Sequence, residues 1–161
     1  MSIEYYNGDL LESGCDYICH QVNCQGVMAS GIAKSIREKW PVVFEKYKVF
    51  LDNPFRQAGT GCYQVYPLGQ IQYVDVNDKQ TVINMFSQQN YGYDNQRYTS
   101  YDAFVDALCE IRKGVPKGSR IGFPYGIGCV RGGASWNIIH DMIAEELGND
   151  YQVEIWRFDK G

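Results

Sequence analysis

The sequence has few cations. Its 161 residues include 15 Lys and Arg against 19 Asp and Glu, which gives a formal net charge of −4 and an isoelectric point near 5.1. Proteins that hold duplex DNA or RNA do so with clustered cations, because phosphate contacts supply much of the affinity. The composition therefore argues against a nucleic-acid partner. If the protein binds an anion, backbone amides must supply most of the contacts.

Long apolar runs are also missing. No stretch approaches the ~20 apolar residues that a transmembrane helix needs. Residues 1–6 have neither the basic nor the apolar region of a secretory signal peptide. We therefore expect a cytoplasmic protein without a membrane partner.

Cysteine pairs with metal-binding spacing are absent as well. The six cysteines include no C-x-x-C pair. Cys15, Cys19 and Cys24 lie close to His20, but a zinc site would need a second ligand pair downstream. Nothing in the sequence indicates secretion, so a disulfide framework is not expected either. We expect reduced, mostly buried thiols, with no metal and no cofactor.

No linker, internal repeat or low-complexity tail interrupts the chain. Its length is near the commonest domain size, and a chain of this length can bury roughly 70% of its unfolded surface. We expect a single domain over residues 1–161 and a monomer.

Strands and helices alternate along the chain. Short apolar runs between turn residues predict strands at residues 3–6, 17–23, 61–66, 71–76, 81–86, 119–123 and 151–158. Apolar residues at helical spacing predict helices at residues 33–40, 42–51, 101–113 and 135–147. This alternation is typical of an α/β fold, with a mixed, mostly parallel sheet between helices. A turn at residues 67–70 would join the third and fourth strands.

Four loops are expected to meet at one edge of that sheet, because ligands bind outside the carboxyl ends of the strands in such folds. These loops are residues 8–10, 23–32, 87–100 and 125–133. The last belongs to the segment FPYGIGCVRGG, residues 123–133, where glycine and proline are concentrated. Glycines there could simply serve tight turns, or they could let backbone amides approach an anion. The convergence of the loops favours a ligand.

The ordered motifs resemble the macrodomain family over essentially the whole length. The matching pieces are Gly8-Asp9-Leu10, HQVNCQG at residues 20–26, ASGIA at residues 29–33, PYGIGC at residues 124–129, and then Trp136. The resemblance implies a three-layer α/β/α fold with a mixed six-stranded sheet, one strand fewer than predicted above. It also implies a small-molecule ligand, ADP-ribose or a derivative of it.

Residue by residue, the resemblance implies a binding site. Asp9, flanked by Gly8 and Leu10, would bind the adenine amino group, and Asn23 would lie near the distal ribose. Phe158 would lie against adenine. Two loops would close around the diphosphate and the distal ribose: Gly26, Ser30, Gly31 and Ile32 in the first, and Tyr125, Gly126, Ile127, Gly128, Cys129, Val130 and Arg131 in the second.

Local alternatives remain for three of these residues. Asp9 could form an Asx-turn or cap a helix, and Asn23 could cap a turn. Phe158 could be an ordinary core residue.

Two catalytic subgroups of the family are relevant. One removes ADP-ribose from modified glutamate with a lysine after the fourth strand and an aspartate in the late loop. This sequence has Gly132 at the late-loop position and no lysine at residues 84–89, so we do not expect that mechanism.

The other subgroup resembles ADP-ribose 1″-phosphate phosphatases, with a histidine before the binding asparagine and an aspartate after the fourth strand. His20 and Asp94 are the candidates here, and a histidine near its ordinary pKa can activate water. The strand must bend if His20 and Asn23 are to reach one ligand. His20 could instead be a buried, hydrogen-bonded core residue.

The expected function is therefore hydrolysis of ADP-ribose 1″-phosphate to ADP-ribose and phosphate. The alternatives are a non-catalytic reader or scavenger of ADP-ribose or related nucleotides, and an O-acyl- or protein-ADP-ribose hydrolase. The tyrosine-rich residues 87–101 could stack nucleobases, but Arg97 is their one cation. A lid over the distal ribose is the favoured interpretation.

Overall fold

The computed structural model describes residues 3–52, 55–57, 62–64, 67–92, 94, 96–130 and 132–158, with only the backbone at 55–57 and 62–64. The strands are β1 (Ile3–Asn7), β2 (Tyr17–Val22), β3 (Phe55–Gln57), β4 (Cys62–Gln64), β5 (Ile71–Asp75), β6 (Thr81–Phe86), β7 (Arg120–Pro124) and β8 (Gln152–Arg157). The helices are a 3-10 turn η1 (Leu10–Glu12), α1 (Gly31–Lys39), α2 (Pro41–Asp52), α3 (Tyr101–Gly114) and α4 (Trp136–Leu147).

Six strands form the central sheet, in the order β1-β8-β7-β2-β6-β5. The neighbouring strands are parallel except for β5, an edge strand antiparallel to β6. The sheet is thus mixed and mostly parallel, as predicted. The four predicted helices are confirmed, with boundaries that shift by at most two residues.

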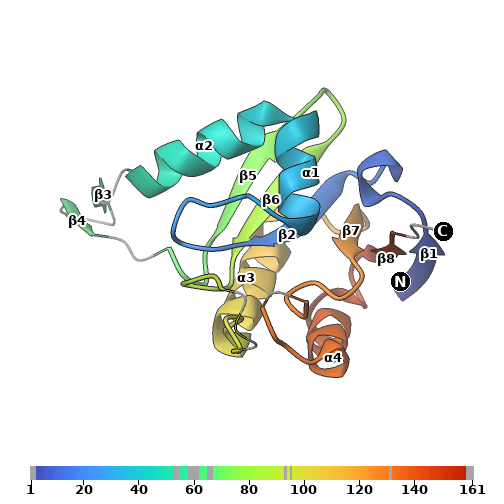
Figure 1. The fold of residues 1–161 in the computed structure, drawn as a ribbon. Coiled ribbons are helices and arrows are strands. Elements are labelled where there is room, and N and C mark those ends of the chain that lie inside the picture. Colours follow the sequence, from blue (N-terminus) through green and yellow to red (C-terminus); the bar gives the residue numbers. More distant parts are fainter. Residues whose placement is uncertain are drawn as a thin grey trace.

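Helices cover both faces of the sheet (Figure 1). α1 and α2 pack on one face over a core that includes Ile18, Val22 and Phe86. α3 and α4 pack on the other face over a second core that includes Cys19, Ile83 and Phe104. Because strand side chains alternate between faces, each central strand supplies residues to both cores. This is the three-layer α/β/α architecture.

The predicted strand at residues 61–66 does not pair with β5. Residues 62–64 instead form β4, which pairs antiparallel with β3 outside the central sheet. The turn at 67–70 is attached to β6, since Gly69 N donates to Phe86 O at 2.7 Å. β3 lies only a few residues before β4, so the loop between them closes with little loss of entropy. The sequence pattern alone does not distinguish β3 from β5 as the partner of β4. The predicted residues 61, 65 and 66 lie outside the described part of the chain.

Connections from β2 and β7 leave the sheet in opposite directions. These two strands are parallel neighbours, but β2 leads into α1 on one face while β7 leads into α4 on the other. In open α/β sheets, ligands commonly bind outside the carboxyl ends of neighbouring strands whose connections part in this way. The loops after β2 and β7 are therefore the first candidates for a binding site.

A polar ladder crosses the interior of the sheet on the α1/α2 face. His20 on β2 faces Asn84 on β6, and the His20 Nε2 and Asn84 Oδ1 atoms are 2.5 Å apart. Asn84 Nδ2 donates to Gln72 Oε1 on β5 at 3.0 Å, and Gln72 Nε2 donates to the Lys46 carbonyl of α2. His20 and Asn84 are fully buried. The ladder ties three strands and one helix together.

Burial lowers the pKa of His20 to about 4, although the hydrogen bond with Asn84 acts in the opposite direction. Its second ring nitrogen, Nδ1, is buried without a hydrogen-bond partner in the described structure. A charged imidazolium at this position would have no anionic partner in the ladder and would lose its hydration. His20 is therefore a neutral part of the core.

None of the described helices is long and apolar enough to cross a bilayer.

Cys15 and Cys19 are buried, and Cys24, Cys109 and Cys129 are half-buried; these five cysteines are free thiols. Burial raises the pKa of Cys15 to about 12 and of Cys24 to about 11. These five thiols are thus protonated and unreactive near neutral pH.

We predict that the free energy of unfolding falls as the pH is lowered from about 6.5 to about 4. Between the ordinary pKa of 6.5 and the lowered value, the unfolded chain binds a proton at His20 that the folded chain does not. The stabilisation is complete above pH 6.5, and about 3 kcal/mol is lost towards pH 4. Urea unfolding at a series of pH values measures it.

The chain offers a matched control in its second histidine, the half-buried His140 on α4. His20→Gln should remove the His20 contribution to the pH dependence, while His140→Gln should retain it. If His20→Gln kept the full wild-type slope, the buried neutral state of His20 would be wrong.

Candidate functional site

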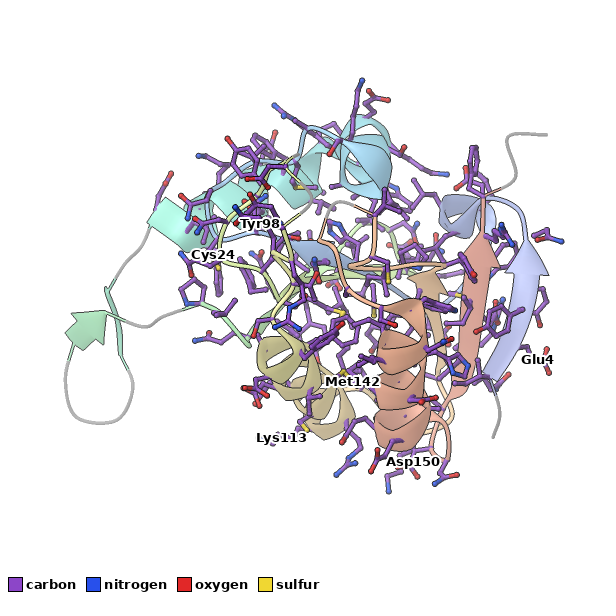
Figure 2. All side chains as sticks on the ribbon, turned by 60° about the horizontal axis from the view of Figure 1, so that its bottom comes forward. Glu4, Cys24, Tyr98, Lys113, Met142 and Asp150 are labelled. Atoms are coloured by element: carbon purple, nitrogen blue, oxygen red, sulfur yellow. The ribbon has the colours of Figure 1, made fainter. Side chains whose placement is uncertain are left out.

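Loops after the parallel strands meet at the carboxyl edge of the sheet and are hydrogen bonded to one another. Gly8 N donates to Arg157 O, and Cys24 N donates to Gln89 O at 3.1 Å. Figure 2 labels Cys24 and Tyr98 on the loops after β2 and β6, well apart from Lys113 and Asp150, which lie towards the opposite edge. Together with the bonds from Tyr98 N and Thr99 N to Gly132 O, these contacts join the predicted loops at residues 23–32, 87–100 and 125–133, whereas Gly8 contacts the end of β8.

The late loop after β7 consists of two overlapping turns. Ile127 N donates to Pro124 O, and Cys129 N donates to Gly126 O. Gly126 and Gly128 occupy the third position of each turn, both with φ of +76°. A turn of type II needs this conformation at that position, and only glycine adopts it without strain. The spacing of the glycines in PYGIGC therefore follows from the turn geometry.

These turns leave alternate amides of the late loop available. Among the described residues, no hydrogen-bond acceptor is bound to the amides of Gly126, Gly128 or Val130. Val130 is 87% exposed at the tip of the loop. Successive backbone N–H groups in a glycine-rich turn form a concave site for an anion. The turn and ligand interpretations of this segment are thus compatible.

Asn23 organises the loop after β2. Its Oδ1 accepts hydrogen bonds from Gln25 N at 2.9 Å and from the Tyr47 hydroxyl at 2.8 Å, and its Nδ2 donates to Val27 O. Tyr47, fully buried on α2, also accepts from Gly26 N. These contacts match the local alternative for Asn23. Binding of ribose by its side chain stays a prediction.

The same loop ends in an uncapped helix. Ser30 occupies the N-cap position of α1, but its side chain makes no capping hydrogen bond. The amides of residues 28–33 have no acceptor within the described structure, and the next amide, Lys34 N, reaches Ser30 O at 3.4 Å. A helix N-terminus carries partial positive charge and unpaired N–H groups. This arrangement suits an anion.

Asp9 follows β1 and caps the 3-10 turn η1. One carboxylate oxygen accepts from Leu11 N at 2.9 Å, which matches the local alternative for this residue. Its other oxygen accepts no hydrogen bond from the described residues. Gly8 has φ of +144°, and a Cβ on it would lie 3.1 Å from the Trp156 ring. Trp156 therefore fixes the backbone just before Asp9, whose role in binding adenine stays a prediction.

The end of β8 supplies aromatic residues to the same edge. Phe158 is 60% exposed, so the alternative of an ordinary core residue is wrong. Trp156 stacks on Tyr6 with ring centroids 4.9 Å apart, and its Nε1 donates to Glu154 at 2.9 Å. Glu154 is buried and forms an ion pair with Arg120 at 2.7 Å.

This Glu154 network is a structural support that the sequence analysis missed. Burial acts to raise the pKa of Glu154, but hydrogen bonds from Arg120 and Trp156 outweigh it, so the pKa is lowered. Arg120 also donates to the carbonyls of Ser13 and Gly14, which follow η1. The network thus holds the segment after Asp9 against β7 and β8.

The two predicted catalytic residues are not brought together. His20 is fully buried in the middle of β2, while Asp94 is exposed in the loop after β6. Asp94 accepts a hydrogen bond from the Tyr98 hydroxyl at 2.6 Å, and this bond lowers its pKa. The strand does not bend to present His20 with Asn23. The alternative of a buried, hydrogen-bonded His20 describes its surroundings, and we do not retain the catalytic pair.

Arg131, predicted in the late loop, and Tyr93, one of the tyrosine-rich residues 87–101, lie outside the described residues. A cavity of about 670 Å³ lies at the amino edge of the sheet, lined by residues 75–81 and by Asp16, Tyr17 and Ser119. It is far from the converging loops.

Within the described ranges, no group of three or more His, Cys, Asp and Glu side chains could hold a metal ion.

Comparisons with known proteins give one curated relative. It is the DNA ADP-ribosyl glycohydrolase of Thermus aquaticus, 23% identical over 158 residues. That match covers 98% of this chain but 41% of the relative, so the chain spans about two fifths of the relative's length. No family model matches the sequence.

Solved structures resemble the chain over nearly its whole length. The macrodomain protein from Streptomyces coelicolor has a TM-score of 0.76 at 23% identity, covering 99% of this chain and all of that one. The macrodomain of Mycobacterium tuberculosis DarG has a TM-score of 0.75 at 21% identity, covering 96% of both chains. Thermosipho africanus DarTG, in complex with ADP-ribose, has a TM-score of 0.72 at 16% identity, covering 98% of this chain and 42% of that one.

At these identities the likeness establishes the fold, and it agrees with the order and direction of the strands described above. The resemblance inferred from the sequence motifs is therefore confirmed: the chain has the macrodomain fold.

Proposed function

We propose that the protein binds ADP-ribose or a close derivative in the crevice between the loops after β2 and β7. One observation carries this proposal. Each of the two loops after β2 and β7 presents backbone amides that have no acceptor among the described residues, at residues 28–33 and at Gly126, Gly128 and Val130. These are donors for a diphosphate, placed where the topology opens a crevice.

Backbone amides explain how an acidic protein can hold an anionic ligand. The net charge of −4 opposes the approach of a diphosphate, but a helix N-terminus and a glycine-rich loop attract it locally. Such contacts need no lysine or arginine. The remainder of the ligand is then recognised at the two ends of the crevice.

At the adenine end, Asp9 can accept a hydrogen bond from an exocyclic amine through its free oxygen while the other oxygen caps η1. Phe158 is exposed beside the end of β8 and can pack on the base. At the ribose end, Asn23 holds its loop in shape through Val27, Gln25 and Tyr47, and the second N–H of its amide remains to donate to a ribose hydroxyl.

Relatives support the same ligand. The structure of Thermosipho africanus DarTG contains ADP-ribose, and the Thermus aquaticus relative is named as an ADP-ribosyl glycohydrolase. The proposal rests on the site geometry of this chain, and these proteins indicate the ligand class. Calorimetric titration with ADP-ribose tests it, and an absence of binding would overturn it.

We predict that Gly128→Val abolishes binding of ADP-ribose. A Cβ at this position would lie 3.0 Å from Gln21 Oε1 and 3.1 Å from Thr99 Oγ1, and valine is strained at φ of +76°. The loop would have to move, and its amides with it. Gly118→Val is the matched control, since Gly118 has φ of +87° in the turn before β7 at the opposite edge. Tight binding by a folded Gly128→Val protein would remove this loop from the site.

Asp9→Ala should weaken binding of ADP-ribose by about 1–3 kcal/mol, the cost of leaving a polar partner unpaired. Asp16→Ala is the control, because Asp16 also accepts from a backbone amide, Arg120 N at 2.9 Å, but at the amino edge of the sheet. Calorimetry on both variants distinguishes a binding role from a capping role. Equal affinities for wild type and Asp9→Ala would place adenine elsewhere.

A hydrolytic step is the second candidate function, favoured by the activity in the name of the Thermus aquaticus relative. The narrower expectation, release of phosphate from ADP-ribose 1″-phosphate by His20 and Asp94, has no support from their positions. A fully buried imidazole bonded to Asn84 does not reach a ligand at the strand ends. Any hydrolysis would then depend on groups in the loops and on positioning of the substrate.

Turnover assays separate these possibilities. We expect His20→Ala to leave the rate of any hydrolysis, measured with the 1″-phosphate and with an ADP-ribosylated oligonucleotide, within a few-fold of wild type. A fall of about 10²–10⁴-fold, the usual value of a positioned acid–base group, would restore His20 to catalysis. Binding without turnover of either substrate would leave a non-catalytic reader.

A further inference from the structure

A cluster of polar side chains lies beneath the late loop on the α3/α4 face of the sheet. Gln21 of β2 accepts a hydrogen bond from Ser87 Oγ at 2.6 Å. Its Nε2 donates to Gln88 Oε1 at 2.5 Å and to Thr99 Oγ1 at 2.9 Å. Ser87, Gln88 and Thr99 are buried. We call these four side chains the polar clamp.

Through Thr99, the polar clamp reaches the backbone of the late loop. Thr99 Oγ1 donates to the Gly128 carbonyl at 2.8 Å, and that carbonyl also accepts from Ala134 N at 3.0 Å. The next amide, Cys129 N, donates to Gly126 O. Both polar groups of the peptide between Gly128 and Cys129 are therefore bonded, which fixes the orientation of that peptide plane.

Gly132 shows how closely the clamp and the loop fit. A Cβ there would lie 2.0 Å from Thr99 Oγ1 and 2.4 Å from Gly128 O. The Gly132 carbonyl accepts from both Tyr98 N at 2.7 Å and Thr99 N at 3.0 Å. The late loop thus rests on the end of the tyrosine-rich loop, and neither can shift without disturbing the other.

We propose that Thr99, held by Gln21, is a positioning residue that orients the late-loop amides of Gly128 and Val130 towards an anionic ligand. This inference rests on the proposed function. The free amides alternate with bonded peptide groups, so the direction of each free N–H is set by its bonded neighbours. Among the described residues, the Thr99 hydroxyl alone gives that backbone a side-chain hydrogen bond from another loop.

The clamp also couples two loops of the site. Ser100 N donates to Ser87 O, so the tyrosine-rich loop begins and ends at the same place. Gln88 and Thr99, near its two ends, are both bonded to Gln21. Gln21 therefore connects both ends of the tyrosine-rich loop, through Thr99, to the late loop.

The test uses Thr99→Val, which keeps the shape of the side chain and removes the hydroxyl, and Thr99→Ser, which keeps the hydroxyl. Thr81→Val is the matched control, since the Thr81 hydroxyl donates to Asp75 at the opposite edge of the sheet. Two quantities are measured well below the melting temperature. They are the affinity for ADP-ribose by calorimetry, and the hydrogen exchange rates of the Cys129 and Ala134 amides in the free protein.

We expect Thr99→Val to bind ADP-ribose about tenfold more weakly and to exchange the Cys129 and Ala134 amides faster than wild type, because one hydrogen bond to the loop is lost. Thr99→Ser should restore both quantities, and Thr81→Val should change neither. A purely structural role would lower the melting temperature but leave the affinity of the folded protein unchanged.

Three results would contradict part of this inference. Unchanged affinity and exchange in Thr99→Val would overturn the positioning role while the proposed function stands. Equal loss in Thr99→Ser and Thr99→Val would show that the hydroxyl is not the cause. If wild type failed to bind ADP-ribose while exchange still responded to Thr99→Val, the loop-holding role would stand and the ligand assignment would fall.

Discussion

The parallel pairing of β2 with β7 is the constraint on which the site depends. Their hydrogen bonds bring two segments a hundred residues apart in the sequence to neighbouring positions. The helices that follow pack on opposite faces, because the apolar residues of α1 and α4 belong to different cores. The two loops must therefore diverge from adjacent strand ends. The ligand crevice that we propose between them would follow from the pairing and needs no dedicated side chain.

Charge in this crevice comes from the backbone. The amides of residues 28–33 lead into α1, and those of Gly126, Gly128 and Val130 alternate along the late loop. Partial charges of this kind are fixed by the fold, so they need no flexible cationic side chains to be ordered on binding. This explains how the protein can combine an acidic composition with a site suited to an anion. It also makes the geometry of the loops decisive, since a rotated peptide would present a carbonyl in place of an amide.

Much of the fold could be predicted from sequence because it depends on local periodicity. The spacing of Phe104, Leu108 and Ile111 predicted α3, and the glycines at 126 and 128 predicted turns that the structure contains. Side-chain roles were harder to predict. His20 was expected at a ligand, but its surroundings are set by the register that places it opposite Asn84, 64 residues later. Nothing within a few residues of His20 reveals that partner.

The same argument applies to the polar residues that the sequence analysis missed. Gln21 lies within HQVNCQG but was given no role of its own, and Thr99 lies in none of the quoted motifs. Their contacts join β2, the loop after β6 and the late loop. In a buried region, a side chain with its hydrogen bonds filled cannot also bind a ligand without losing one of them.

Hydrogen-bond completeness therefore separates the two kinds of residue here. Among the described residues, Gln21 and Thr99 have their N–H and O–H donors bonded and shape the loops. Asn23 keeps one amide N–H beyond its bond to Val27 O, and several backbone amides in each of the two loops have no acceptor among these residues. An ionisable side chain attracts attention in the sequence, but the site that we propose for this fold is made largely of peptide groups that the side chains leave unbonded.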